Sequence, residues 1–175
     1  MARLRPGRTC RSPNSQAWAR YSLRKPKKNY IRALPHTSIQ AFDTGADKPE
    51  YSLVATLETQ YPIQLRSNAL ESARISIVRY MDENAPQAYY MKLLVFPHNV
   101  IREHKMAAGA GADRISRGMS LAFGRPVSVA ARIRGSQPVF MVKTTKENRE
   151  FAVKALSRAS SKLSGAYKVR VAAAQ

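Results

Sequence analysis

Residues 1–36 form a stretch of chain that contains no acidic side chain and is interrupted by four prolines, Pro6, Pro13, Pro26 and Pro35. Prolines at these intervals exclude a continuous helix, because each one removes an N–H donor and clashes with the preceding turn. Large apolar residues are sparse here. The sequence therefore predicts an extended arm over 1–36 without a core of its own, followed by a globular domain over 37–175. The basic side chains of the arm are Arg3, Arg5, Arg8, Arg11, Arg20, Arg24, Lys25, Lys27, Lys28 and Arg32.

Two other interpretations of this stretch stay open. It could be a disordered solubilising tail, or an organelle transit peptide, although transit peptides are usually amphipathic helices. Its aromatic residues, Trp18, Tyr21 and Tyr30, stand among the cations. They suit stacking on bases, or they could anchor the arm to the domain.

The charge of the whole chain calls for a polyanionic partner. The formal net charge is +19, and it is unevenly distributed. Residues 37–100 hold five bases and seven acids, whereas residues 101–175 hold fifteen bases and four acids. Nucleic acid is the first candidate partner, because phosphate neutralisation releases counterions. A membrane surface is the second, but no apolar run is long enough to span a bilayer. The start of the chain has no secretory signal and there is one cysteine, Cys10, so we expect a cytoplasmic protein without disulfides.

The pattern over residues 37–175 predicts an α+β domain, with two helices packed on a mostly antiparallel sheet. Ser67 is expected to cap a helix that runs to about Asn84, and Pro86 stops it. A second helix is expected after a capping box formed by Thr144 and Glu147, and Gly165 is expected to end it. The expected strands are 39–42, 51–60, 89–96, 127–133, 139–143 and 167–171, with a turn over 43–49.

The segment 101–126 is rich in glycine and basic residues, and four of its glycines are Gly109, Gly111, Gly118 and Gly124. A flexible loop of this kind usually has a binding role. It matches neither a dinucleotide fingerprint nor a P-loop, because the position of the final glycine in each motif is occupied by another residue. The three histidines, His36, His98 and His104, have no metal-ligand spacing, and we take His98 as structural. Ion pairing with nearby arginines is the simplest role for Glu103 and Asp113. We therefore expect no catalytic residue, metal, cofactor or small-molecule substrate.

The same segment resembles a known family signature. Ala110-Gly111-Ala112-Asp113-Arg114, Gly118-Met119 and 122–126 (AFGRP) are similar to the archaeal and eukaryotic ribosomal protein L-ten-e family of the large subunit, whose bacterial counterpart is L-sixteen. The opening 5–8 (RPGR) and residues 69–75 (ALESARI) also resemble it. Thr9 and Cys10 stand where the family often has Cys-Tyr. The long C-terminal extension of eukaryotic members is absent, so the chain looks archaeal in type.

This resemblance implies a hammerhead-like α/β sandwich and a structural protein of the cytoplasmic ribosome rather than an enzyme. It implies binding of 23S-type large-subunit rRNA near the central protuberance and the peptidyl-transferase region. Further implied partners are tRNA, 5S rRNA and neighbouring ribosomal proteins. A free-standing RNA- or DNA-binding protein, or an RNA chaperone, is the alternative function. The expected rRNA-binding residues are the ten cations of the arm together with Arg125. The expected tRNA-facing loop spans about 102–119, with Arg102, His104, Lys105, Gly109, Gly111, Arg114 and Arg117.

Overall fold

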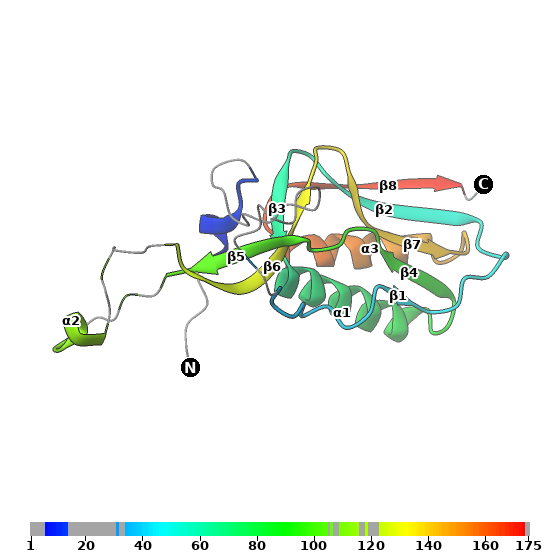
Figure 1. Ribbon diagram of the computed structural model, residues 1–175. Coiled ribbons are helices and arrows are strands. Elements are labelled where there is room, and N and C mark those ends of the chain that lie inside the picture. The colour runs from blue at the N-terminus through cyan, green and yellow to red at the C-terminus, as the bar shows by residue number, and fades with distance from the viewer. Residues whose placement is uncertain are drawn as a thin grey trace.

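The computed structural model describes residues 6–13, 31, 34–104, 106, 109–115, 118 and 123–173 (Figure 1). Its helical segments are the 3-10 turn η1 (Gly7–Cys10) and the helices α1 (Ser67–Asn84), α2 (Ala112–Ile115) and α3 (Arg149–Ser160). Its strands are β1 (Asp43–Thr44), β2 (Leu53–Thr59), β3 (Ile63–Arg66), β4 (Tyr89–Leu93), β5 (Asn99–Glu103), β6 (Arg125–Ile133), β7 (Pro138–Thr144) and β8 (Tyr167–Ala173).

Within these residues the strands form two antiparallel sheets. The larger sheet has the order β1-β4-β7-β2-β8, and the smaller one has the order β3-β6-β5. Residues of β2 alternate between buried and half-buried, which is the pattern of a sheet with one covered face. α1 and α3 lie side by side against that face, below the large sheet in Figure 1. The structure thus confirms the predicted α+β class.

The helices are built as their apolar periodicity predicts. Leu70, Ala73, Ile77 and Met81 recur at helical spacing along α1, and none of them is exposed to solvent. Ala155, Leu156 and Ala159 of α3 are equally buried, and all of these residues belong to one core with the inner faces of β2, β4 and β7. Removing so much apolar surface from water is the main source of stability for the domain.

The predicted N-terminal caps of both helices are wrong, and α3 ends at Ser160 rather than at Gly165. α1 has the predicted extent, but Ser67 is its first helical residue and the extended Arg66 occupies the cap position, without a side-chain cap hydrogen bond. Thr144 ends β7, and its hydroxyl donates a hydrogen bond to the Ala88 carbonyl oxygen at 2.9 Å instead of capping a helix. α3 therefore begins later, at Arg149, after Asn148.

The strand predictions also need correction. Residues 39–42 are not a strand, and β1 falls inside the segment expected as a turn. The predicted strands 127–133 and 139–143 do not continue one sheet, because β6 pairs with β3 and β5 whereas β7 pairs with β2 and β4. The sequence did not predict β3, β5, α2 or η1.

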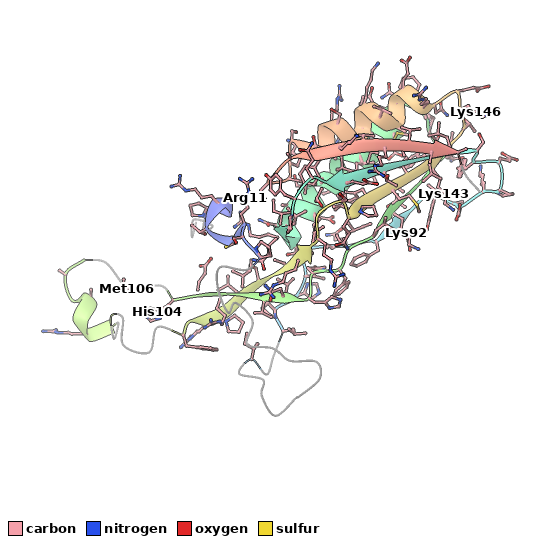
Figure 2. The ribbon with its side chains drawn as sticks, turned by 90° about the horizontal axis from the view of Figure 1, so that it is seen from above. Arg11, Lys92, His104, Met106, Lys143 and Lys146 are labelled. Carbon is pink, nitrogen blue, oxygen red and sulfur yellow. The ribbon has the colours of Figure 1, made fainter. Side chains whose placement is uncertain are left out.

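The described chain is elongated. β5 and β6 run away from the helices, and α2 lies at the far end of the segment between them (Figure 1). In the view from above, His104 and Met106 mark this end of the molecule and Lys146 marks the other (Figure 2). The glycine-rich loop is therefore held at a distance from the core.

Candidate nucleic-acid interface

Eight of the predicted site residues lie in the described part of the chain, and ten lie outside it. The eight are Arg8, Arg11, Arg102, His104, Gly109, Gly111, Arg114 and Arg125. The ten outside the described residues are Arg3, Arg5, Arg20, Arg24, Lys25, Lys27, Lys28, Arg32, Lys105 and Arg117.

The N-terminal segment is bound to the small sheet by a buried polar network around Gln64. The Gln64 backbone N–H donates to the Arg11 carbonyl oxygen at 2.8 Å, and its side-chain amide donates to the Cys10 carbonyl oxygen at 2.8 Å. The Asn99 amide in turn donates to the Gln64 side-chain oxygen. Because Gln64 and Cys10 are almost completely buried, these bonds form in a low-dielectric site and fix the position of η1.

Ile31 makes a second contact with the same sheet, on the opposite face. Ile31 is buried with Val100 and Val129, whereas Cys10 is buried with Ile101 and Ala130. Successive side chains of a strand point to opposite faces, so these two clusters lie on the two sides of the β5–β6 pair. The part of the chain expected to be an arm is thus attached at Cys10 and again at Ile31.

The two described cations of this segment differ in their contacts. Arg11 donates a hydrogen bond to the Tyr61 hydroxyl, and its guanidinium carbon lies 5.3 Å from the centre of that ring. Arg8 sits in η1 with its side chain exposed. The Arg11 side chain therefore already contacts another side chain of the protein, while the Arg8 side chain faces solvent.

The base of the glycine-rich loop is closely packed. Arg102 stacks on Phe123, with its guanidinium carbon 3.8 Å from the ring centre, and it donates a hydrogen bond to the Phe123 carbonyl oxygen. Gly124 has a φ of +75°, and a Cβ there would lie 2.8 Å from the Glu103 carbonyl carbon. Glycine is thus required at 124 both for the backbone conformation and for the close approach to Glu103.

Further out, the loop is held by backbone contacts. The His104 Nε2 lies 2.6 Å from the Gly118 carbonyl oxygen, and because a carbonyl only accepts, this nitrogen carries the proton. The Gly111 carbonyl accepts from the Arg114 N–H at 3.1 Å, within the single turn of α2. Gly109 and Gly111 have positive φ angles with open space around them, so they shape the turn without packing against anything described. The Arg114 side chain is exposed.

Acidic side chains on the body of the protein are largely paired. On the open face of the large sheet, Asp43, Asp47 and Glu58 lie 3.8, 2.7 and 2.9 Å from Lys92, Lys143 and Arg170 respectively. Glu71 forms a two-point contact with Arg74, and this hydrogen bonding holds the pKa of Glu71 below its usual range. These pairs neutralise the central part of the chain.

Arg8, Arg114 and Arg125 show the opposite arrangement. All three are exposed, and none has an ion-pair partner within the residues that the structure describes. Arg125 stands opposite Glu103 in the register of β5 and β6. In the described part of the chain, the cations without carboxylate partners thus include residues of the N-terminal segment and of the β5–β6 hairpin with its loop.

Sequence reasoning missed the residues that hold this arrangement together. Gln64, Asn99 and Tyr61 anchor the N-terminal segment, and none of them stood out from the sequence. The one available signal was a glutamine between two large aliphatic residues, Ile63 and Leu65, because a polar side chain in such a run needs a buried partner.

The described residues contain no group of three or more His, Cys, Asp or Glu side chains that could hold a metal ion. None of the helices in the described ranges is long and apolar enough to cross a membrane. An exposed set of unpaired arginines on an α+β scaffold defines a basic binding protein, and comparison with known proteins gives the class a name.

A family model described as "Ribosomal protein L16p/L10e" matches residues 18–170. The chain is 40% identical over 150 residues to "Large ribosomal subunit protein uL16" of Archaeoglobus fulgidus, covering 85% of this chain and 86% of that protein. The protein of the same name from Thermofilum pendens is 40% identical over 161 residues, covering 91% and 92% of the two chains. The one from Methanococcus maripaludis is 38% identical over 169 residues, covering 96% and 94%.

These comparisons define the class as ribosomal proteins. The chain belongs to the L16p/L10e family of ribosomal proteins, with archaeal relatives over most of its length. The family prediction is confirmed, and with it the prediction of a structural ribosomal protein rather than an enzyme.

Proposed function

We propose that this chain is a structural component of the large ribosomal subunit that binds large-subunit rRNA through its N-terminal segment and its β5–β6 hairpin. The observation that carries the proposal is the contrast between paired and unpaired charge. Lys92, Lys143 and Arg170 on the open face of the large sheet have carboxylate partners. Arg8, Arg114 and Arg125 have none among the described residues. Guanidinium groups bind phosphate oxygens in a two-point fashion, so exposed arginines suit an RNA backbone.

The remaining cations of the N-terminal segment extend this interface. Nine further bases lie in residues 1–36, and no acid opposes them there. RNA helices are recognised mainly by shape and phosphate contacts, so an irregular basic chain can follow such a surface. The contacts of Cys10 and Ile31 with the small sheet support this, because they attach these two residues of the basic segment to the sheet that also carries the loop.

The loop between β5 and β6 is assigned to tRNA, in the region of the peptidyl-transferase centre and below the central protuberance. It extends away from the core, which suits a segment that reaches toward a substrate path (Figure 1). Its glycines and alanines would allow the backbone to approach RNA closely, while Arg114 supplies a charge for phosphate. 5S rRNA and neighbouring ribosomal proteins are the further partners of this proposal.

The rRNA proposal is tested by the salt dependence of binding. Each phosphate contact that is lost should reduce the slope of log K against log salt by about 0.7–0.9. We expect the double variant Arg8→Gln/Arg125→Gln to bind large-subunit rRNA more weakly and with a slope smaller by about 1.5. The matched control is Arg170→Gln, because Arg170 is held by Glu58 at 2.9 Å on the open sheet face. Equal slopes for all three proteins would contradict the assignment.

The tRNA proposal is tested by shortening the loop. Deleting residues 107–111 should leave the core intact, because the hydrogen bonds of Gly109 and Gly111 stay within the loop and a Cβ at either position would meet nothing within 4 Å. We expect unchanged thermal unfolding together with impaired subunit maturation or tRNA positioning in cells that carry only this variant. Normal growth and normal subunit profiles would refute a role of the loop in translation.

A further inference from the structure

Three aromatic rings lie in a row where the chain passes from the large sheet to the small one. The ring centres of Phe42 and Phe96 are 5.3 Å apart, with an angle of 16° between the ring planes. The ring centres of Phe96 and His98 are 4.6 Å apart, with an angle of 42°. We call Phe42, Phe96 and His98 the aromatic stack. The first pair has the offset-stacked geometry that aromatic rings prefer.

The aromatic stack is open to solvent at one end. Residues 93–98 alternate, with Leu93, Val95 and Pro97 buried and the residues between them exposed. Phe42 packs partly against the core, whereas Phe96 is 49% exposed and His98 is exposed as well. His98 therefore forms the accessible end of the row, and Phe96 lies between it and Phe42. Packing of the core does not require these rings to be exposed to solvent. An exposed apolar cluster commonly marks a binding surface.

One attachment point of the acid-free segment lies two residues from the aromatic stack along the chain. Val100, two residues after His98, is buried against Ile31, and Ile31 is preceded in the sequence by Lys27 and Lys28 and followed by Arg32. The stack thus lies near the point where the acid-free segment meets the body.

The carboxylates nearest to the aromatic stack, either in the sequence or through a backbone contact, already have cationic partners. Asp43, which follows Phe42, accepts a hydrogen bond from Tyr90 at 3.1 Å and lies 3.8 Å from Lys92. Glu71, which contacts the backbone of Gln40, is held by Arg74. A basic protein segment would find no unpaired acid among these groups, so the charge around the stack favours RNA.

We propose that the aromatic stack is a binding site for an unpaired base of ribosomal RNA, which continues the row of rings beyond His98. This inference rests on the proposed function and names one subsite within it. Proteins hold unstacked RNA bases mainly by stacking them on aromatic side chains, because every base offers a π-face. The stack would then supply an uncharged contact beside the phosphate contacts of the arginines.

The test is the affinity of the full chain for purified 23S-type rRNA. We expect His98→Leu to weaken binding by roughly 5- to 150-fold, which is the range for the loss of one base–aromatic stack. Phe96→Leu should act in the same direction because the Phe96 ring supports His98, while Phe96→Tyr and His98→Phe should retain affinity because they keep a ring. The slope of log K against log salt should not change, because no phosphate contact is removed. Leu94→Ala is the matched control, since Leu94 is an exposed apolar residue on the same side of the segment without a ring.

The possible outcomes separate this inference from the proposed function. If the unaltered chain binds rRNA with a steep salt dependence and both leucine variants bind equally well, the base site is refuted and the proposed function stands. If the unaltered chain shows no salt-dependent binding, the proposed function fails. If the leucine variants bind free rRNA normally but associate poorly with the assembled subunit, the stack contacts a protein and the inference is overturned. His98→Leu keeps the test valid if Phe96→Leu fails to fold, because His98 is exposed.

Discussion

The attachment of the N-terminal segment can be tested by replacing Gln64 with leucine. This substitution keeps the approximate size of the side chain, so the cavity it leaves is small. It removes two hydrogen bonds, one from the Gln64 amide to the Cys10 carbonyl oxygen at 2.8 Å and one from the Asn99 amide to Gln64. The backbone bond from Gln64 to the Arg11 carbonyl oxygen remains.

The cost of the substitution follows from the two groups left without partners. The Cys10 carbonyl, in η1, and the Asn99 amide, in β5, both belong to buried residues. A buried polar group that loses its partner costs roughly 1–3 kcal/mol. Because two such costs in one hydrogen-bond network do not add fully, we expect the docked state of the segment to be destabilised by about 2–4 kcal/mol relative to the released state.

Cys10 provides a direct assay of this release. It is the only cysteine in the chain and its side chain is 1% exposed, so a thiol reagent reacts with it only after the segment opens. When closing is faster than labelling, the reaction rate follows the population of the open state. Gln64→Leu should then accelerate labelling of Cys10 roughly 30- to 1,000-fold.

The matched control is Gln60→Leu, because Gln60 is exposed and its one side-chain hydrogen bond in the described structure is long, at 3.5 Å. Its labelling rate should stay close to that of the unaltered chain. An unchanged rate in Gln64→Leu would refute the conclusion that this network holds the segment in place.

Two further predictions concern stability. Gly111→Ala should lower the free energy of unfolding by about 1–2 kcal/mol through its positive φ alone. Gly124→Ala should lower it by about 1–3 kcal/mol more than Gly111→Ala does, because its Cβ would meet the Glu103 backbone. Equal losses for the two variants in chemical denaturation would contradict the close packing at the base of the loop. Hydrogen bonding from Arg74 lowers the pKa of Glu71, so the stability that this pair contributes is present above the pKa of an unfolded glutamate and is lost as the pH falls through the lowered folded value. Glu71→Gln should therefore remove about 1 kcal/mol at neutral pH and flatten the acid side of the stability profile, and a profile parallel to that of the unaltered chain would disprove this.

The helices could be predicted because their signal is local. The apolar residues of α1 repeat at helical spacing and Pro86 lies just beyond its end, so its extent of 67–84 follows from the sequence. The caps could not be predicted in the same way. Thr144 and Glu147 have the spacing of a capping box, but the pairing of β7 with β2 and β4 extends to Thr144 and takes its hydroxyl for Ala88. A tertiary contact overrides the local motif here.

The division into two sheets depends on contacts between distant segments. β6 and β7 are separated by four residues, yet they pair with different neighbours. β3 alternates apolar and polar residues, but over only four positions, which is too short a run to stand out from the sequence. β5 mixes polar with apolar positions without alternation. For the candidate interface, charge and glycine content selected the two segments that we propose. They could not show that Gln64, Asn99 and Ile31 attach the basic segment to the sheet that carries the loop, because that depends on the fold.

The most direct test of the central claim is sedimentation of the chain with ribosomal subunits. A tagged copy expressed in an archaeal host should travel with the large subunit through a sucrose gradient at moderate salt and dissociate as the salt concentration rises, because phosphate contacts weaken with salt. The Arg8→Gln/Arg125→Gln variant should dissociate at a lower salt concentration than Arg170→Gln. A chain that remains at the top of the gradient, or that spreads over all RNA-containing fractions, would contradict the account and indicate a free-standing nucleic-acid-binding protein.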